Sequence, residues 1–330
     1  MPWSCVINSI VLTLAIATVT LAAPPAEPER LLHALSEAAE ALADDGHADV
    51  ERARYIAASG YATLGKLEDA RRLARQLPES LSRTDLLSKA DAVEPAADPG
   101  QDIPQWPWER LSPHASAAVA ALERGDDARA RQHVLQIPER HASYYHSVAA
   151  RRVLGMCERN SQQAERAEAA ALTAHLFTRR NQPDAAKAEA SRAHLEALVR
   201  YLDGDPTGFY NVVFCHIAHG DDATLAALAS LLEPFGGLDA AWPRVGIAHI
   251  KRSRGEPHAA ILNEAKQLFA EVNDPVYFSW YEGFVDSADG DAAEQAVADL
   301  HEGRLTDLGY VLGLRAGLDM LIRLPLEPTK

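Results

Sequence analysis

Apolar residues recur every three or four positions along much of the chain, which is the spacing of one face of an α-helix. The stretch after the turn at Gly65 shows the pattern clearly. Its apolar positions are Leu67, Ala70, Leu73, Ala74 and Leu77. This spacing predicts a helix that buries one face against its neighbours.

A short opening, Gly or Asn followed by Asp, Glu or Pro and then Ala, precedes several such helices. It begins at Gly65, Gly125, Asn181, Gly220, Gly255 and Gly290, and the last three intervals are 39, 35 and 35 residues. Gly or Asn can take the left-handed conformation that ends one helix, and the residue after it suits the first turn of the next. The sequence therefore predicts a stack of antiparallel helical hairpins.

The first two intervals are longer, at 60 and 56 residues. Helical patterns at 82–93 and 141–159 indicate that these units carry an added helix. The Pro-rich residues 94–113 cannot form a continuous helix, so we expect a linker between an N-terminal unit, 24–93, and a main array, 114–330, that ends in a capping helix. Trp106 and Trp108 of this linker are expected to dock on a helix; a presented ligand motif is the alternative.

The composition agrees with helices. The chain has 61 Ala and only 6% aromatic residues, and Ala is the best helix former and allows helices to approach closely. We predict an all-α fold of about twelve or thirteen antiparallel helices that stack into a right-handed superhelix.

The residues at three positions around the inter-helix Gly resemble the pattern of a known repeat family. Ala58, Tyr61 and Ala70 surround Gly65 at the spacing of tetratricopeptide repeats, with a small residue seven before, an aromatic four before and Ala five after. The unit around Asn181 keeps the same pattern, whereas Ala121 replaces the aromatic before Gly125 and the later units match poorly. The chain resembles a degenerate tetratricopeptide-like solenoid over most of residues 46–302, which implies an α-α superhelix with a concave binding groove.

The N-terminus resembles a secretory signal peptide. Residues 1–23 carry no charge, Val6–Leu21 is nearly all apolar, and small residues precede Pro24. We expect cleavage near Ala22 or Ala23 and a periplasmic or secreted mature protein; retention of the segment as a membrane anchor is the alternative. In an oxidising compartment Cys157 and Cys215 either pair or remain free, and the sequence leaves both open.

The charge excludes some partners. The chain has a net charge of -15 and no long run of Lys or Arg, so nucleic acid and anionic lipid are poor partners. No catalytic or cofactor motif is present, and no metal or cofactor is expected. Cys215 and His219 share a helix face but lack a third ligand, and the paired carboxylates at Asp126, Asp221 and Asp289 stand at turns, where helix capping explains them.

The repeat register predicts a binding surface. In the resembled family, positions thirteen, ten, six and three before the inter-helix Gly line the groove, and scarce aromatics gather there. The predicted binding residues are Tyr55, Tyr210, Phe214, Trp242, His249, Arg252, Tyr277, Trp280 and Phe284. All of them except Tyr55 lie in residues 207–284, which are interpreted as the recognition face. The alternative is that they pack between helices as core.

Two functions remain open. The first is a non-enzymatic scaffold that binds a peptide or protein partner in the concave groove. The second is an accessory or catalytic component of peptidoglycan processing, because some periplasmic lytic transglycosylases carry a helical superhelix. Residues 303–330 leave no room for a lysozyme-like catalytic domain, so we favour the scaffold.

Overall fold

The computed structural model describes residues 28–91, 112–156, 166–270 and 275–323. The predicted signal segment, Cys157, Trp106 and Trp108 lie outside these ranges. The α-helices are α1 (Pro28–Asp44), α2 (Val50–Thr63), α3 (Leu67–Ala74), α4 (Leu81–Lys89), α5 (Pro113–Glu123), α6 (Asp127–Leu135), α7 (Tyr145–Val153), α8 (Arg166–Arg179), α9 (Pro183–Leu202), α10 (Phe209–Ala218), α11 (Asp222–Leu232), α12 (Gly237–Ser253), α13 (Ala259–Ala270), α14 (Pro275–Asp286), α15 (Gly290–His301) and α16 (Leu308–Arg323). Short 3₁₀ turns are η2 (Glu139–His141), η3 (Pro206–Gly208) and η4 (Glu233–Phe235).

The all-α prediction is confirmed, since every regular element of the described residues is helical. These described ranges contain sixteen α-helices, more than the twelve or thirteen predicted. Added helices do account for the two long intervals: α4 follows the first hairpin and α7 follows the second, and each is shorter than its apolar pattern indicated.

The predicted turn chemistry is largely confirmed. Gly65, Gly125, Gly220 and Gly255 have φ between 64° and 78°, and Asn181 has φ 53°, so each takes the left-handed conformation that closes a helix. Capping is confirmed as well, because acidic side chains such as Asp126 accept the backbone N–H of the third residue after them, at 2.9 Å in that case. Gly290 differs: it is the first residue of α15, and Asp289 caps that helix.

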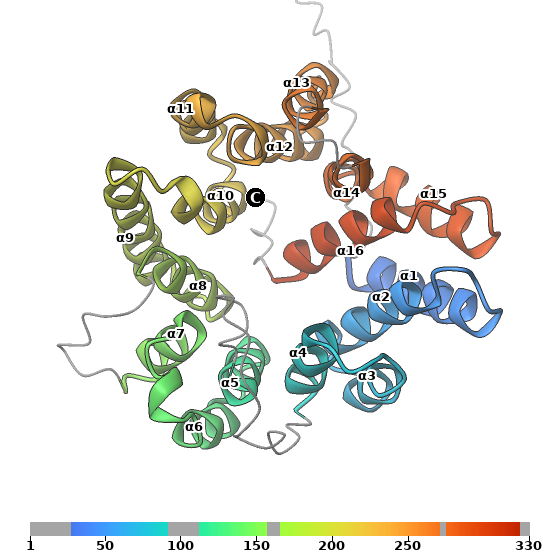
Figure 1. The fold of residues 1–330 in the computed structure, drawn as a ribbon, viewed down its shortest axis with the longest axis horizontal. Coiled ribbons are helices and arrows are strands. Elements are labelled where there is room, and N and C mark those ends of the chain that lie inside the picture. The colour runs from blue at the N-terminus through green and yellow to red at the C-terminus, as the bar shows by residue number, and fades with distance from the viewer. Residues whose placement is uncertain (1–27, 92–111, 157–165, 271–274, 324–330) are drawn as a thin grey trace, which may run out of the picture.

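The hairpins follow one another around a ring that closes on itself (Figure 1). At the closure, α1 packs against α15 and α16, and α2 also contacts α16. One hydrophobic cluster joins the two ends of the chain, from Leu32 and Leu35 of α1 to Val297 of α15 and Leu314 of α16. The expected unit 24–93 therefore shares its core with the end of the main array, and the superhelix has an enclosed interior instead of an open groove.

Glycines fix the position of α16. Gly309, Gly313 and Gly317 recur every four residues, so they share one face of this helix. A Cβ at Gly313 would overlap the carbonyl oxygen of Trp280 in α14, and a Cβ at Gly283 of α14 would overlap the carbonyl oxygen of Tyr310. The backbones of α14 and α16 are therefore in direct contact, which leaves other faces of α16 for α1, α2 and the interior.

We predict that Gly313→Ala lowers the free energy of unfolding by about 3 kcal/mol, because the added methyl meets backbone that cannot move aside. Gly246→Ala is the matched control. Its Cβ would lie 3.0 Å from the Leu225 side chain and 3.1 Å from that of Ile217, and would meet no backbone atom at these distances. Side-chain ends can shift where backbone cannot, and Ala favours a helix, so a loss of about 1 kcal/mol is expected. Urea unfolding measures both, and equal losses would contradict the packing assigned to Gly313.

Candidate binding site inside the ring

Four of the residues predicted to form a recognition face, Tyr210, Phe214, Trp280 and Phe284, surround Trp242 of α12. Trp242 is 2% exposed, stacks on Tyr210 of α10 at 5.4 Å between ring centroids, and donates its indole N–H to the Tyr210 carbonyl at 3.0 Å. Phe284 of α14 is 0% exposed and His249 is 3% exposed, and their rings lie 4.9 Å apart. These three side chains are core, as in the packing alternative, and are closed to a partner.

The other predicted binding residues have mixed surroundings. Trp280 is partly buried and stacks on Phe284, while Arg252 is paired with Asp286 and Asp289 at 3.5 Å and 3.1 Å. Tyr55 lies beneath Arg315, the Tyr277 side chain lies outside the described residues, and Phe214 faces both the core and the interior of the ring. The prediction of one exposed face is wrong for Trp242, His249 and Phe284, because α10, α12 and α14 pack against one another through these positions.

A cavity of about 340 Å³ lies inside the ring. We call it the central cavity. Its walls come from α7, α8, α10 and α16, with apolar surface from Leu172, Phe214, Ala316 and Met320. Polar and charged side chains complete the lining: Tyr145, His146, Glu168, His175, Thr178, Asn211, His219, Arg315, Asp319 and Arg323.

Four residues of this lining carry a buried polar atom without a hydrogen-bond partner in the described structure. These atoms are Nδ1 of His146, Oε2 of Glu168, Nε2 of His175 and Nε of Arg315, of which His175 Nε2 lies 3.4 Å from a Glu123 carboxylate oxygen. Such atoms are uncommon in folded proteins, because an unmade hydrogen bond leaves the cost of removing water uncompensated. Burial also lowers the pKa of His146 to about 4, so this imidazole is neutral at pH 7. The lining of the central cavity thus contains both donor and acceptor atoms whose hydrogen bonds are not made.

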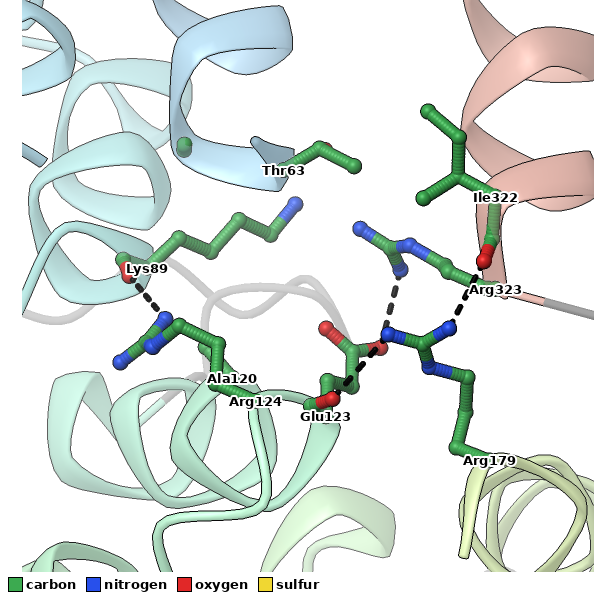
Figure 2. A pocket seen from close by; sticks show the side chains of 9 residues that line it. Thr63, Lys89, Ala120, Glu123, Arg124, Arg179, Ile322 and Arg323 are labelled. Carbon is green, nitrogen blue, oxygen red and sulfur yellow. Dashed lines mark hydrogen bonds and ion pairs between the residues drawn. The ribbon is translucent and has the colours of Figure 1, made fainter. Parts of the chain in front are cut away.

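A smaller pocket shares Arg323 with the central cavity, and its lining includes Glu123 at the end of α5 (Figure 2). Glu123 accepts from Arg323 at 2.9 Å and lies 3.4 Å from His175 Nε2. Arg179 of α8 donates to the backbone carbonyls of Glu123 and Ile322, at 3.2 Å and 2.7 Å. This cluster therefore joins the ends of α5 and α16 to α8.

The ion pairs of this cluster control its charges. Burial alone would raise the pKa of Glu123, but the charges of Arg323 and His175 outweigh burial and hold it well below the ordinary value. Burial would lower the pKa of Lys89, yet Asp85 at 2.8 Å raises it. The Glu123 carboxylate is therefore ionised and paired with Arg323, and this pair gives the cluster a structural part in closing the ring.

The thiol considered as a metal ligand is buried. Cys215 Sγ lies 3.8 Å from the Ala171 carbonyl, and burial raises the pKa of the thiol to about 12. His219 Nδ1 lies 2.6 Å from the carbonyl of Cys215, so the ring is tied to its own helix. The described residues contain no group of three ligands suited to a metal ion, and Cys157 falls outside them.

Sequence reasoning missed the charged lining of the interior. Arg315, Asp319 and Arg323 do stand four residues apart on the terminal helix, a pattern that gives them one face. That signal does not say which helices lie opposite, and Glu123 and Glu168 come from distant hairpins whose meeting depends on ring closure.

No family model matches the chain, and neither a curated protein nor a solved structure shows significant similarity to it. Among the described helices, none combines the length and apolar character needed to cross a bilayer.

We predict that Trp242→Ala lowers the free energy of unfolding by about 3–5 kcal/mol, since it removes a buried indole that contacts two neighbouring helices. Phe235→Ala is the control, because Phe235 is 41% exposed and should cost less than about 1 kcal/mol. A small effect of Trp242→Ala on chemical unfolding would restore the view that this side chain faces a partner.

The buried imidazole of His249 should make the stability of the protein depend on pH. Burial lowers its pKa to about 4, and the unfolded chain has an ordinary value near 6.5, so between these pH values the unfolded state binds more protons. Stability should fall as pH falls, by about 2 kcal/mol from pH 7 to pH 5 for this residue. Urea unfolding at both pH values should show a smaller loss in His249→Gln; parallel losses in the two proteins would refute the assignment.

Proposed function

We propose that this protein is a non-enzymatic binding protein that takes a short peptide into the central cavity. The observation that carries the proposal is the cavity itself, whose volume of about 340 Å³ falls within the range of small-ligand sites. Its lining combines an apolar wall with unpartnered polar atoms on three helices, α7, α8 and α16.

The closed ring favours a short peptide over a folded partner. An open superhelix presents its concave face along its whole length, whereas here α1, α2, α15 and α16 meet and enclose that face. Several groove positions of the resembled repeats are also occupied by core packing around Trp242. A partner is therefore expected to enter the interior as a short or extended segment.

The proposal extends to the class and location of the protein. The left-handed residues at five hairpin turns support a degenerate tetratricopeptide-like solenoid. The uncharged, apolar residues 1–23 support export to the periplasm or the medium. The ion pairing of Glu123 and the capping by Asp126 and Asp221 support a protein without catalytic acids over a peptidoglycan-processing enzyme.

Filling the central cavity tests the proposal. Ala316→Phe places a phenyl group on the α16 wall, while Ala226→Phe adds the same group to an exposed position of α11 as a control. A pool of dipeptides and tripeptides from hydrolysed casein is dialysed to equilibrium against each protein, and the retained peptides are measured by mass spectrometry.

The native protein and Ala226→Phe should retain peptides, and Ala316→Phe should retain at least about tenfold less, because the ligand and the phenyl group compete for one space. Circular dichroism establishes that both variants are folded. Retention unaffected by Ala316→Phe, or no retention by the native protein, would count against a peptide site in this cavity.

A further inference from the structure

Charge is divided unevenly between two walls of the central cavity. On the α8 wall, Glu168 Oε1 accepts from Arg200 at 2.5 Å, whereas Oε2 is buried and has no partner in the described structure. Arg200 also donates to Asp205 at 2.5 Å, so one guanidinium serves two carboxylates. A cationic group of a ligand would complete the coordination of Glu168.

The α16 wall carries a positive charge, that of Arg315, without a carboxylate partner among the described residues. Arg315 donates a hydrogen bond to the Ser59 hydroxyl, and its guanidinium lies over the Tyr55 ring at 5.7 Å from the centroid. Neither contact carries a negative charge, and no carboxylate of the described residues pairs with Arg315, although Asp319 on the same helix pairs with Arg323 at 3.0 Å. Because Nε of Arg315 is also buried without a partner, this side chain is suited to an anion.

We infer that the central cavity binds a zwitterion with an apolar side chain, whose ammonium group contacts Glu168 and whose carboxylate contacts Arg315. This inference rests on the proposed function and specifies its ligand. A carboxylate matches the planar donors of a guanidinium, and an ammonium group supplies the donors that Glu168 Oε2 lacks. Leu172, Phe214 and Met320 line the same cavity and supply apolar surface for the side chain.

The same chemistry has two sources, a free amino acid and a short peptide with both ends unblocked. Isothermal titration calorimetry with leucine and with leucyl-leucine distinguishes them. Two blocked probes isolate the charges: N-acetyl-leucyl-leucine lacks the ammonium group, and leucyl-leucine amide lacks the carboxylate. We expect one unblocked ligand to bind, and blocking either of its ends to weaken binding by at least about tenfold. If that ligand is leucine, N-acetyl-leucine and leucinamide replace the blocked dipeptides.

Variants assign each charge to its wall. Glu168→Gln should remove the preference for the free amine and keep the preference for the carboxylate, and Arg315→Gln should do the reverse. Arg315→Lys keeps the positive charge and should retain part of the carboxylate preference, which separates a charge effect from loosening of α16. Glu302→Gln and Arg304→Gln, at an exposed ion pair beyond the cavity, are the controls and should behave as the native protein does.

The outcomes separate this inference from the proposed function. If N-acetyl-leucyl-leucine and leucyl-leucine amide bind as tightly as leucyl-leucine and Ala316→Phe abolishes that binding, the cavity binds peptides and the zwitterion inference is wrong. If blocking the ends weakens binding but Glu168→Gln and Arg315→Gln leave the preferences for the free amine and the carboxylate unchanged, the assignment of the charges to these residues is wrong. If no probe binds, the inference fails, and the proposed function fails with it when casein peptides are not retained either.

Discussion

The direct backbone contact between α14 and α16 is the constraint on which the closed form of this protein depends. Any side chain at Gly313 or Gly283 would separate the two helices. At the observed spacing, one face of α16 fits against α14 while Leu308, Val311, Leu314 and Leu318 join the cluster that includes α1. The glycines thus make close packing possible at α16, because they leave room for α1 and α2 to contact this helix as well as α14.

The same contact organises the interior. With α16 fixed, Arg315 points to Tyr55 and Ser59 of α2, and Arg323 reaches Glu123 at the end of α5. Arg179 then bonds to carbonyls at the ends of α5 and α16, where helices have unsatisfied acceptors. The charged lining is therefore a result of closure.

Local features of the fold could be predicted from the sequence, and long-range ones could not. Left-handed residues such as Gly65 and Asn181 and capping residues such as Asp126 act on their own neighbours, so their effects are visible in a short stretch of chain. Gly290 differs because it is the first residue of α15 and Asp289 caps that helix. The groove register placed Trp242, counted from Gly255, and Phe284, counted from Gly290, on a surface, but both are core because neighbouring hairpins pack there.

The candidate site was hidden for a related reason. Glycines at 309, 313 and 317 were present in the sequence, but their partner, Gly283 of α14, could not be identified from spacing alone. Glu168 and Arg315 likewise belong to no recognisable sequence motif. They can be identified as candidate site residues only because the ring brings α8 and α16 to one cavity. The curvature of a helical stack is set by small rotations at each interface, which the repeat length does not encode.

Closure also has a consequence for the order in which the molecule can form. Arg30 of α1 pairs with Glu294 of α15, and Arg315 bonds to Ser59, so the joint is built from segments at opposite ends of the chain. A chain made from its N-terminus can assemble hairpins as they emerge, but Leu32 and Leu35 stay without their final neighbours until the last helix is complete. Contacts so distant in sequence form slowly, because a long loop must close before they stabilise anything. The seam between α1 and α16 is therefore where a nascent or truncated chain would be most prone to associate with another copy.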